Sequence, residues 1–308
     1  MGVSPNGKKI DLQEGEMMDA ILVTGAAGYV GWNLCRALLE KGYSVRGSLM
    51  NEKEQQLLPN GVEPFVTGEI AGETDWSSAL HDVASVVHLA ARVHQKEEKS
   101  EENLVLFRRT NTDATVALAE QALANGIRSF VFLSSVAVHG VNKTEEPLRI
   151  DSPIRPTTHY GQSKWEAEQK LTVLFKDANA SLTILRPTMV YGPQAPGNFA
   201  RLTGMVRTGI PLPLGSVNNK RHFVFIDKLV SLIMEAMEQT EAGVRTRFAC
   251  DEQPLSTKEL VQLAGKWEGK KTRLFPFPTD LLPLLLACIG KKDEWDKLAG
   301  DFLVQRSR

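Results

Sequence analysis

Short apolar runs rich in β-branched residues alternate with longer helical patterns from Asp19 to Arg186. Buried strands are predicted at Ala20 to Thr24, Ser44 to Leu49, Val62 to Val66, Ala84 to Ala91, Ser129 to Ser134 and Leu182 to Arg186. Helices are predicted from Tyr29 to Lys41, from about Asn103 to Ala124 and from Tyr160 to about Ala178. Because parallel strands need crossover connections, the alternation predicts an α/β fold with a doubly wound parallel sheet.

A glycine-rich segment joins the first predicted strand to the first predicted helix. Glycines at this place allow a tight turn and a close approach to a pyrophosphate, which the amides and dipole of the helix N-terminus then hold. The spacing, G-x-x-G-x-x-G, departs from the commonest dinucleotide pattern. The predicted dinucleotide contacts here are Gly25, Gly28, Tyr29, Val30 and Gly31.

Two later segments lie where a bound dinucleotide would extend. Glu69 and Ile70 follow the third strand, where a carboxylate can accept a hydrogen bond from the adenine amino group. Leu89, Ala90 and Ala91 end the fourth strand with mostly small side chains, which leaves room for ribose and pyrophosphate at the carboxyl edge of the sheet. A solvated Glu69 and simple packing at residues 89 to 91 are the structural alternatives.

The regular alternation of strand and helix patterns stops after Arg186. Prolines and glycines break the pattern into loops and shorter helices. We therefore predict a flexible leader at residues 1–18, a dinucleotide-binding domain at 19–186, and a smaller, mainly substrate-binding region at 187–308 with some segments that return to the sheet. The apolar run from Leu281 to Ile289 contains Pro283 and is too short to span a bilayer, so it predicts a packed amphipathic helix; a membrane-surface patch is the alternative.

Composition excludes several classes of partner. The chain has 36 basic and 37 acidic residues and a formal net charge of -1, which gives no electrostatic footprint for nucleic acid or an anionic membrane. Cys35, Cys250 and Cys288 are far apart. Their spacing favours neither a disulfide framework nor a zinc or other metal site, and it favours a reducing, cytoplasmic location.

Tyr160 and Lys164 open the third predicted helix on one face, because residues four apart on a helix are neighbours. A phenol is a poor base near its reference pKa of about 10, and a fixed cation nearby favours the phenolate. Ser135 lies at the end of the fifth strand, facing the ligand crevice, where its hydroxyl could hold a substrate oxygen. Asn111, on the long helix, could anchor the lysine through water, or be a polar surface residue.

In this order, four motifs carry a resemblance to a known family. They are Thr24-Gly-x-x-Gly-x-x-Gly31, Ser134-Ser135…Gly140, Tyr160-x-x-x-Lys164, and Leu185-Arg-Pro187…Tyr191-Gly-Pro193. Together they resemble the extended short-chain dehydrogenase/reductases, of the NAD-dependent epimerase/dehydratase type that acts on nucleotide sugars. The resemblance implies a Rossmann-type fold and a catalytic set of Ser135, Tyr160 and Lys164. It also implies cofactor contacts from Tyr160, Lys164 and Pro187, with Lys164 holding the nicotinamide ribose.

The second half of the chain favours a nucleotide-sugar substrate. Arg221 opens a segment, Arg221 to Asp227, that is similar to the family's Arg-Asp-Tyr-Ile-His-Val-x-Asp. The planar fork of arginine suits a diphosphate. By resemblance, Asn198 and Arg221 bind the nucleotide diphosphate, and Ser135 and Tyr160 contact the sugar. The motif context resembles a bacterial subgroup near UDP-glucose 4-epimerase, which includes reductases that make UDP-N-acetylquinovosamine for surface polysaccharide.

The sequence departs from the family pattern in three places. Dehydratases of the family carry Asp-Glu directly after the catalytic Ser or Thr, and this chain has Val136-Ala137, which cannot move protons. The following turn reads Val138-His139-Gly140, where many members have Val-Tyr-Gly. The chain also ends soon after Asp301, so a terminal segment common in relatives is expected to be missing. The first departure predicts that the chain is not a dehydratase.

Cofactor choice depends on the end of the second strand. NAD-specific enzymes place an acid there, and this sequence has Leu49 and Met50, with no acid until Glu52. Ser48 and Asn51 could hydrogen-bond a phosphate, although the arginine typical of NADP-specific relatives is missing. The sequence therefore favours NADP(H) over NAD.

We predict a nucleotide-sugar 4-epimerase or 4-ketoreductase that acts on a UDP-hexose or UDP-N-acetylhexosamine. A homodimer is a candidate assembly. We expect no nucleic-acid partner and no insertion into a membrane. One alternative is an NADPH-dependent reductase of a non-nucleotide ketone, resembling the dihydroflavonol reductases, which Gly42 to Arg46 favours and Arg221 and Asn198 disfavour. Another alternative is a non-catalytic NADPH-sensing regulator, which has no need of the Ser, Tyr and Lys set.

Overall fold

The computed structural model describes residues 20–93, 100–278 and 292–306. The predicted leader, the predicted helix from Leu281 to Ile289 and Cys288 lie outside the described residues. In the described part of the chain no helix combines the length and apolar character that crossing a membrane requires.

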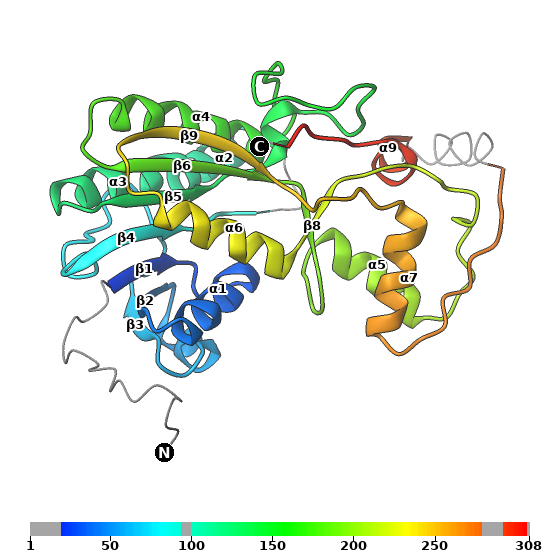
Figure 1. Ribbon diagram of the computed structural model, residues 1–308, viewed down its shortest axis with the longest axis horizontal. Coiled ribbons are helices and arrows are strands. Elements are labelled where there is room, and N and C mark those ends of the chain that lie inside the picture. Colours follow the sequence, from blue (N-terminus) through cyan, green and yellow to red (C-terminus); the bar gives the residue numbers. More distant parts are fainter. Residues whose placement is uncertain (1–19, 94–99, 279–291, 307–308) are drawn as a thin grey trace, which may run out of the picture.

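A seven-stranded parallel sheet with the order β3-β2-β1-β4-β5-β6-β9 forms the centre of the molecule (Figure 1). Its strands are β1 (Ala20–Thr24), β2 (Ser44–Leu49), β3 (Glu63–Val66), β4 (Val83–His88), β5 (Ser129–Leu133), β6 (Ser181–Pro187) and β9 (Gly243–Ala249). The strand order reverses between β1 and β4, which pair with each other in parallel. Ligands bind in such sheets beyond the carboxyl ends of the strands, at this switch point. The predicted doubly wound, Rossmann-type sheet is confirmed.

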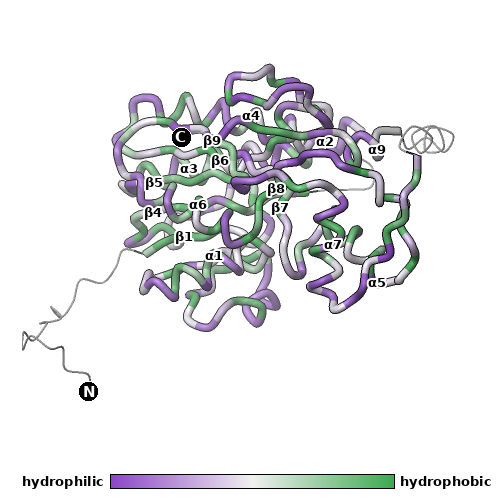
Figure 2. The backbone as a smooth tube through the Cα atoms, turned by 45° about the vertical axis from the view of Figure 1, so that its right-hand side comes forward, coloured by the Kyte–Doolittle hydropathy of each residue, from purple (hydrophilic) through white to green (hydrophobic). Residues whose placement is uncertain are grey.

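Helices cover both faces of the sheet. On one face lie α1 (Tyr29–Glu40) and α6 (Ile226–Glu238), which pack with the strands in one buried apolar cluster. On the other face α3 (Ala114–Ala124) and α4 (His159–Phe175) pack in a second cluster. Figure 2 shows the central strands mostly in the hydrophobic colour, as expected for strands that are buried on both faces.

A smaller region lies beside the carboxyl edge of the sheet (Figure 1). It contains β7 (Met189–Tyr191), β8 (Phe223–Phe225), α5 (Asn198–Arg207), α7 (Thr257–Trp267) and α9 (Lys292–Ala299). β7 and β8 form a two-stranded parallel sheet. This region has an apolar core of its own, in which Tyr191, Phe199 and Leu260 are buried. From it the chain returns to the main sheet through α6 and β9.

The long helix predicted from about Asn103 to Ala124 is interrupted. It consists of α2 (Glu101–Arg108), the π-helical segment η2 (Arg109–Asp113) and α3. Within η2 the Asn111 side chain bonds to the backbone of Arg92, and Thr112 donates to the carbonyl oxygen of Ser163. Hydropathy periodicity could not reveal this segment, because its partners lie far away in the sequence. π-Helical turns of this kind are frequent at functional sites.

Candidate active site

The glycine turn after β1 is packed closely against the end of β4 and the start of α1. Gly25 has a φ of 66°, and a Cβ built on it would lie 3.0 Å from the backbone nitrogen of Ala90. A Cβ on Gly31 would overlap the carbonyl oxygen of Gly25. Glycine therefore fits at both positions where a larger residue would strain the turn. α1 begins after Gly28 with no acidic residue in its first turn, which leaves the helix dipole available to a phosphate.

The end of β4 is held beside this turn by hydrogen bonds. The backbone nitrogens of Leu89 and Ala90 each donate to Thr24 Oγ1 at 3.1 Å. These bonds take the place of sheet pairing, so β4 ends at His88 and not at Ala91 as predicted. Glu69, beyond β3, is exposed, and its neighbour Ile70 is buried.

The turn that carries Ser135 packs against the start of α4. Ser135 is the N-cap of the 3-10 helix η3 (Val136–His139), and its Oγ accepts a hydrogen bond from the Ala137 nitrogen at 3.1 Å. Thr158 caps α4. A Cβ on Gly161 would lie 2.6 Å from the carbonyl oxygen of Ala137, so the absence of a side chain permits this contact. The structure thereby brings Tyr160, in the first turn of α4, to Ser135.

Tyr160 and Lys164 have strongly shifted pKa values. Burial raises the pKa of Tyr160 to about 12, and a side-chain hydrogen bond with Ser135 opposes this effect. Burial lowers the pKa of Lys164 to about 7, and the charge of Glu168 opposes that shift. Lys164 Nζ lies 4.4 Å from the centre of the Phe132 ring and has no hydrogen-bond partner within the described ranges. An ammonium group without an acceptor is costly to bury, which makes it a candidate to bind a ligand.

Asn111 is fully buried and uses its side chain on the protein itself. Its Oδ1 accepts from the Arg92 nitrogen at 2.7 Å, and its Nδ2 donates to the Arg92 oxygen at 3.1 Å and to Ser163 Oγ at 3.0 Å. Both Nδ2 hydrogens are therefore engaged. A water-mediated link to Lys164 stays a prediction.

A buried polar network behind this cluster was missed from the sequence. Arg186, on β6, donates to Glu168 through Nη2 at 2.6 Å and through Nε at 3.1 Å. Ser134 donates to the same carboxylate, and Arg186 Nη1 lies 3.1 Å from His139 Nε2. Burial, assisted by the charge of Arg186, lowers the pKa of His139 to about 4, so the ring is neutral and accepts this bond. A signal existed, because Glu168 continues the four-residue spacing of Tyr160 and Lys164.

The two predicted diphosphate ligands lie in the smaller region. Asn198 is exposed at the start of α5. Pro187, which was predicted as a cofactor contact, is buried at the end of β6. The Arg221 guanidinium donates to the carbonyl oxygens of Gly300 at 2.6 Å, Asp296 at 3.3 Å and Asn142 at 3.2 Å. Burial lowers the pKa of Arg221 to about 10, and it remains a cation at neutral pH. Of its five N–H groups, the Nε–H and one Nη2–H have no acceptor among the described residues.

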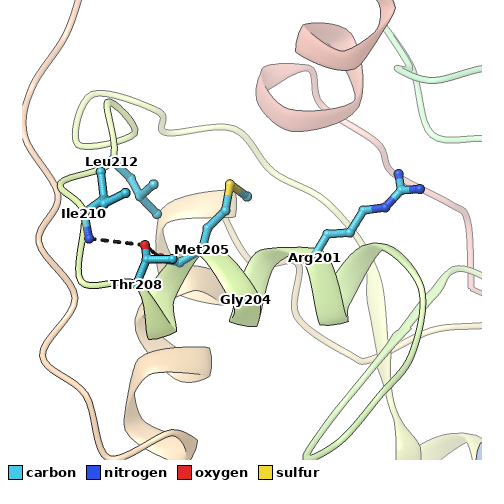
Figure 3. A pocket seen from close by; sticks show the side chains of 6 residues that line it. All are labelled: Arg201, Gly204, Met205, Thr208, Ile210 and Leu212. Carbon is cyan, nitrogen blue, oxygen red and sulfur yellow. Dashed lines mark hydrogen bonds between the residues drawn. The ribbon is translucent and has the colours of Figure 1, made fainter.

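A hollow lies along α5, which begins at Asn198. It has a volume of about 470 Å³ and is lined by Arg201, Gly204, Met205, Thr208, Ile210 and Leu212 (Figure 3). Thr208 Oγ1 accepts a hydrogen bond from the Ile210 nitrogen at 3.4 Å. None of the predicted catalytic residues lines it. Across the described ranges, no cluster of three or more His, Cys, Asp or Glu could hold a metal ion.

Comparison with known proteins adds independent information. The model of the NAD dependent epimerase/dehydratase family matches residues 21–249. A UDP-glucose 4-epimerase of Vibrio cholerae is 37% identical over 297 residues, which cover 95% of this chain and 89% of the relative. An N-acetyl-alpha-D-glucosaminyl-diphospho-ditrans,octacis-undecaprenol 4-epimerase of Escherichia coli O157:H7 is 27% identical, covering 90% and 82%. The crystal structure of UDP-glucuronic acid 4-epimerase from Bacillus cereus in complex with NAD has a TM-score of 0.69 and 25% identity, covering 83% and 87%.

The fold and the glycine turn at its switch point define a dinucleotide-dependent α/β enzyme. The chain belongs to the NAD dependent epimerase/dehydratase family. The predicted family resemblance is confirmed.

Proposed function

We propose that the protein is an NAD-dependent 4-epimerase of a UDP-sugar. The observation that carries the proposal is the packing of α4 against η3, which brings Tyr160, one helical turn before Lys164, to Ser135 near the end of β5. The 37% identity with a Vibrio cholerae UDP-glucose 4-epimerase supports the same reaction. Similarity of fold alone would not support a particular reaction, because one fold hosts many functions.

The residues present fit a nicotinamide dinucleotide. The turn of Gly25, Gly28 and Gly31 would hold the pyrophosphate at the N-terminus of α1, together with the backbone of Tyr29 and Val30. Lys164, which has a buried Nζ without a partner in the described structure, would bind the nicotinamide ribose. The remaining contacts proposed along the carboxyl edge come from Glu69, Ile70, Leu89, Ala90, Ala91, Tyr160 and Pro187. Asn111 is buried and bonded to Arg92 and Ser163, so its proposed role is an indirect one, through water to Lys164.

Three side chains would perform the proton chemistry. When bound, the nicotinamide supplies the site that accepts and returns a hydride. Tyr160 takes the proton of the C4 hydroxyl and returns a proton to that oxygen when the carbonyl is reduced, and Ser135 holds the oxygen by a hydrogen bond. Protonated Lys164 would favour the phenolate of Tyr160 and so oppose the effect of burial, which raises the pKa of the phenol to about 12.

The position of Glu54 supports NAD over the NADP(H) that the sequence favoured. The chain folds back after β2 through η1 (Glu52–Leu57), which places the Glu54 carboxylate at the end of that strand. Glu54 accepts hydrogen bonds from the Met50 nitrogen at 2.8 Å and from Asn51 Nδ2 at 3.4 Å. The adenine ribose binds at this end of the second strand in Rossmann folds. A carboxylate there repels a 2′-phosphate and occupies the Met50 N–H, so we propose NAD as the cofactor.

Arg221 and Asn198 are proposed to bind the diphosphate of the substrate. The Nε–H and the remaining Nη2–H of Arg221 can bond a phosphate in the bidentate mode that guanidinium favours. Arg221→Ala should weaken UDP binding in calorimetry by at least tenfold and leave NAD binding unchanged. Arg207→Ala is the matched control, because Arg207 is an exposed arginine of α5 that pairs with Glu268. Equal UDP affinity in both variants would remove Arg221 from the site.

The same proposal includes an assembly and a location. A homodimer is proposed as the assembly, and Val105 on α2 and Val173 on α4, which are 62% and 77% exposed, are the apolar side chains proposed for its interface. Sedimentation of the wild type and of a Val173→Glu variant tests the interface. The two described cysteines, Cys35 and Cys250, are free and buried, in keeping with a reducing cytoplasm.

The decisive experiment compares cofactor and product in one preparation. The purified protein is first assayed for retained NAD and titrated with NADH and NADPH by calorimetry. It is then incubated with UDP-glucose, UDP-N-acetylglucosamine and UDP-glucuronic acid, with products identified by NMR. The proposal expects NAD to bind more tightly than NADP(H), and it expects C4 epimers to form without net change in nicotinamide absorbance.

Each other outcome corresponds to a different function. Net oxidation of NADPH with a 4-keto UDP-sugar identifies a 4-ketoreductase, and oxidation only with a non-nucleotide ketone identifies a ketone reductase. NADPH binding without any turnover identifies a sensor. A 6-deoxy-4-keto product would contradict the exclusion of dehydratase activity, which rests on Val136 and Ala137.

A further inference from the structure

His88, at the end of β4, joins two hydroxyl groups in the interior. Its Nδ1 lies 2.7 Å from Thr24 Oγ1, and its Nε2 lies 2.8 Å from Thr115 Oγ1. All three residues are fully buried. Thr24 begins the glycine turn and also accepts the bonds from Leu89 and Ala90. His88 is therefore the link between the turn that would hold the dinucleotide and α3 on the far side of β4.

The same line of hydrogen bonds continues to the catalytic helix. Thr115 Oγ1 donates to the carbonyl oxygen of Asn111 at 2.8 Å. Asn111 Nδ2 donates to Ser163 Oγ at 3.0 Å, and that hydroxyl donates to the carbonyl oxygen of Tyr160 at 2.9 Å. An unbroken series of contacts thus runs from Thr24 to the backbone of Tyr160.

The bonds fix the direction of every hydrogen in this series. Each hydroxyl has one hydrogen to donate. Thr115 gives its hydrogen to Asn111, so it must accept one from His88 Nε2–H. The neutral ring then has a bare Nδ1, which accepts the hydrogen of Thr24. Thr24 keeps its lone pairs for the two backbone N–H groups of β4. Burial, assisted by the charge of Lys164, lowers the pKa of His88 to about 3, which agrees with a neutral ring.

We propose that His88, as the neutral Nε2–H tautomer, is a positioning residue of the active site that holds the dinucleotide turn in register with Tyr160. The proposal rests on the proposed function for its effect on turnover. The parts that it connects are the two that must meet for hydride and proton transfer, and small displacements of reacting groups reduce rates steeply. His88 itself touches none of the proposed reacting groups.

The first test observes the tautomer directly. Long-range ¹H–¹⁵N NMR of the imidazole rings, assigned with a His88→Phe variant, should show His88 as the neutral Nε2–H form from pH 5 to pH 8. An Nδ1–H tautomer, or titration near the ordinary pKa of histidine, would overturn the proposal. This measurement needs no enzyme activity.

The second test uses hydroxyl variants that keep the packing. Thr115→Val should lower kcat for epimerisation by about tenfold or more with little change in the KM of the UDP-sugar, because loss of alignment is expressed mainly in kcat. Thr115→Ser, which keeps the hydroxyl, should restore most of the rate. Thr183→Val is the matched control, since Thr183 is a buried threonine of β6 and its hydroxyl has no partner in the described structure.

Dinucleotide affinity separates this inference from the proposed function. His88→Phe and Thr115→Val should both weaken NAD binding by several-fold in calorimetry, whatever the substrate proves to be. If the wild type epimerises no UDP-sugar, the proposed function fails and these affinities decide the role of His88. If Thr115→Val kept the kcat and the NAD affinity of the wild type, the proposal would be overturned. This test remains valid even if His88→Phe does not fold.

Discussion

Arg186 and Glu168 form a buried ion pair that connects β6 to α4, the helix that carries Tyr160 and Lys164. Their closest atoms, Nη2 and Oε2, are 2.6 Å apart, and the side chains are 5% and 2% exposed. The carboxylate also accepts from Ser134, the neighbour of Ser135, and lies one helical turn beyond Lys164. This ion pair therefore connects three elements: the turn that carries Ser135, the helix α4 that carries Lys164, and the strand β6, which ends at Pro187.

Arg186→Met should destabilise the protein strongly. It leaves the carboxylate of Glu168 buried without its cation, and such a loss costs about 3–5 kcal/mol. The double variant Arg186→Met, Glu168→Met should recover most of this free energy, because no uncompensated charge remains. Urea unfolding of the three proteins measures both effects. If Arg186→Met were as stable as the wild type, the buried carboxylate of Glu168 would not need the charge of Arg186.

Tyr160→Phe should abolish turnover and leave NAD binding nearly intact. The change removes only the hydroxyl that would transfer the proton, a role that typically supplies about 10²- to 10⁴-fold in rate. Steady-state kinetics with the best UDP-sugar and calorimetry with NAD measure the two properties. A Phe variant with more than about a tenth of the wild-type kcat would show that Tyr160 is not the acid and base.

Lys164→Met should remove a pH dependence from the stability of the cofactor-free protein. Burial lowers the pKa of Lys164 from an ordinary value of 10.5 to about 7. Between these pH values the unfolded chain binds more protons, so the stability of the wild type relative to the Met variant should rise from pH 7 towards pH 10.5. Below pH 7 the difference should become constant. Urea unfolding at pH 6 to 9 measures it, and a difference that is the same at every pH would contradict the shifted pKa.

Gly161→Ala should reduce activity although alanine is the better helix former. Its Cβ would meet the Ala137 oxygen at 2.6 Å and push α4 away from the turn that carries Ser135. Gly204→Ala, in α5, is the control, because no atom lies within 4 Å of the added Cβ. The control should gain about 0.5–1 kcal/mol from helix propensity. Equal kcat in the two variants would show that the contact between α4 and η3 is not needed.

Hydrophobic periodicity was sufficient for most of the sheet. β1 and β2 have the predicted bounds, Ala20–Thr24 and Ser44–Leu49, since the hydropathy of their own residues distinguishes these strands from the polar or glycine-containing segments beside them. α4 ends at Phe175, three residues before the predicted end. Such ends depend on local hydrogen bonds more than on hydropathy.

The candidate site could be proposed from the sequence where its residues are close together along the chain. The glycine turn and the Tyr160 and Lys164 pair follow from short-range spacing and from the switch point of a doubly wound sheet. By contrast, η2 exists because Asn111 and Thr112 bond to residues 19 and 51 positions away. No local pattern contains those partners.

The sequence by itself determined the alternation of strands and helices, and with it the edge of the sheet at which ligands bind. Only the tertiary structure decided which polar side chains meet there. It placed Glu54 against Met50 at the end of β2, where the sequence had indicated no acid, and it joined Thr24 to Thr115 through His88. The physical reason is that hydrophobic patterns repeat locally along the chain, whereas a buried polar group needs a partner that folding brings from elsewhere.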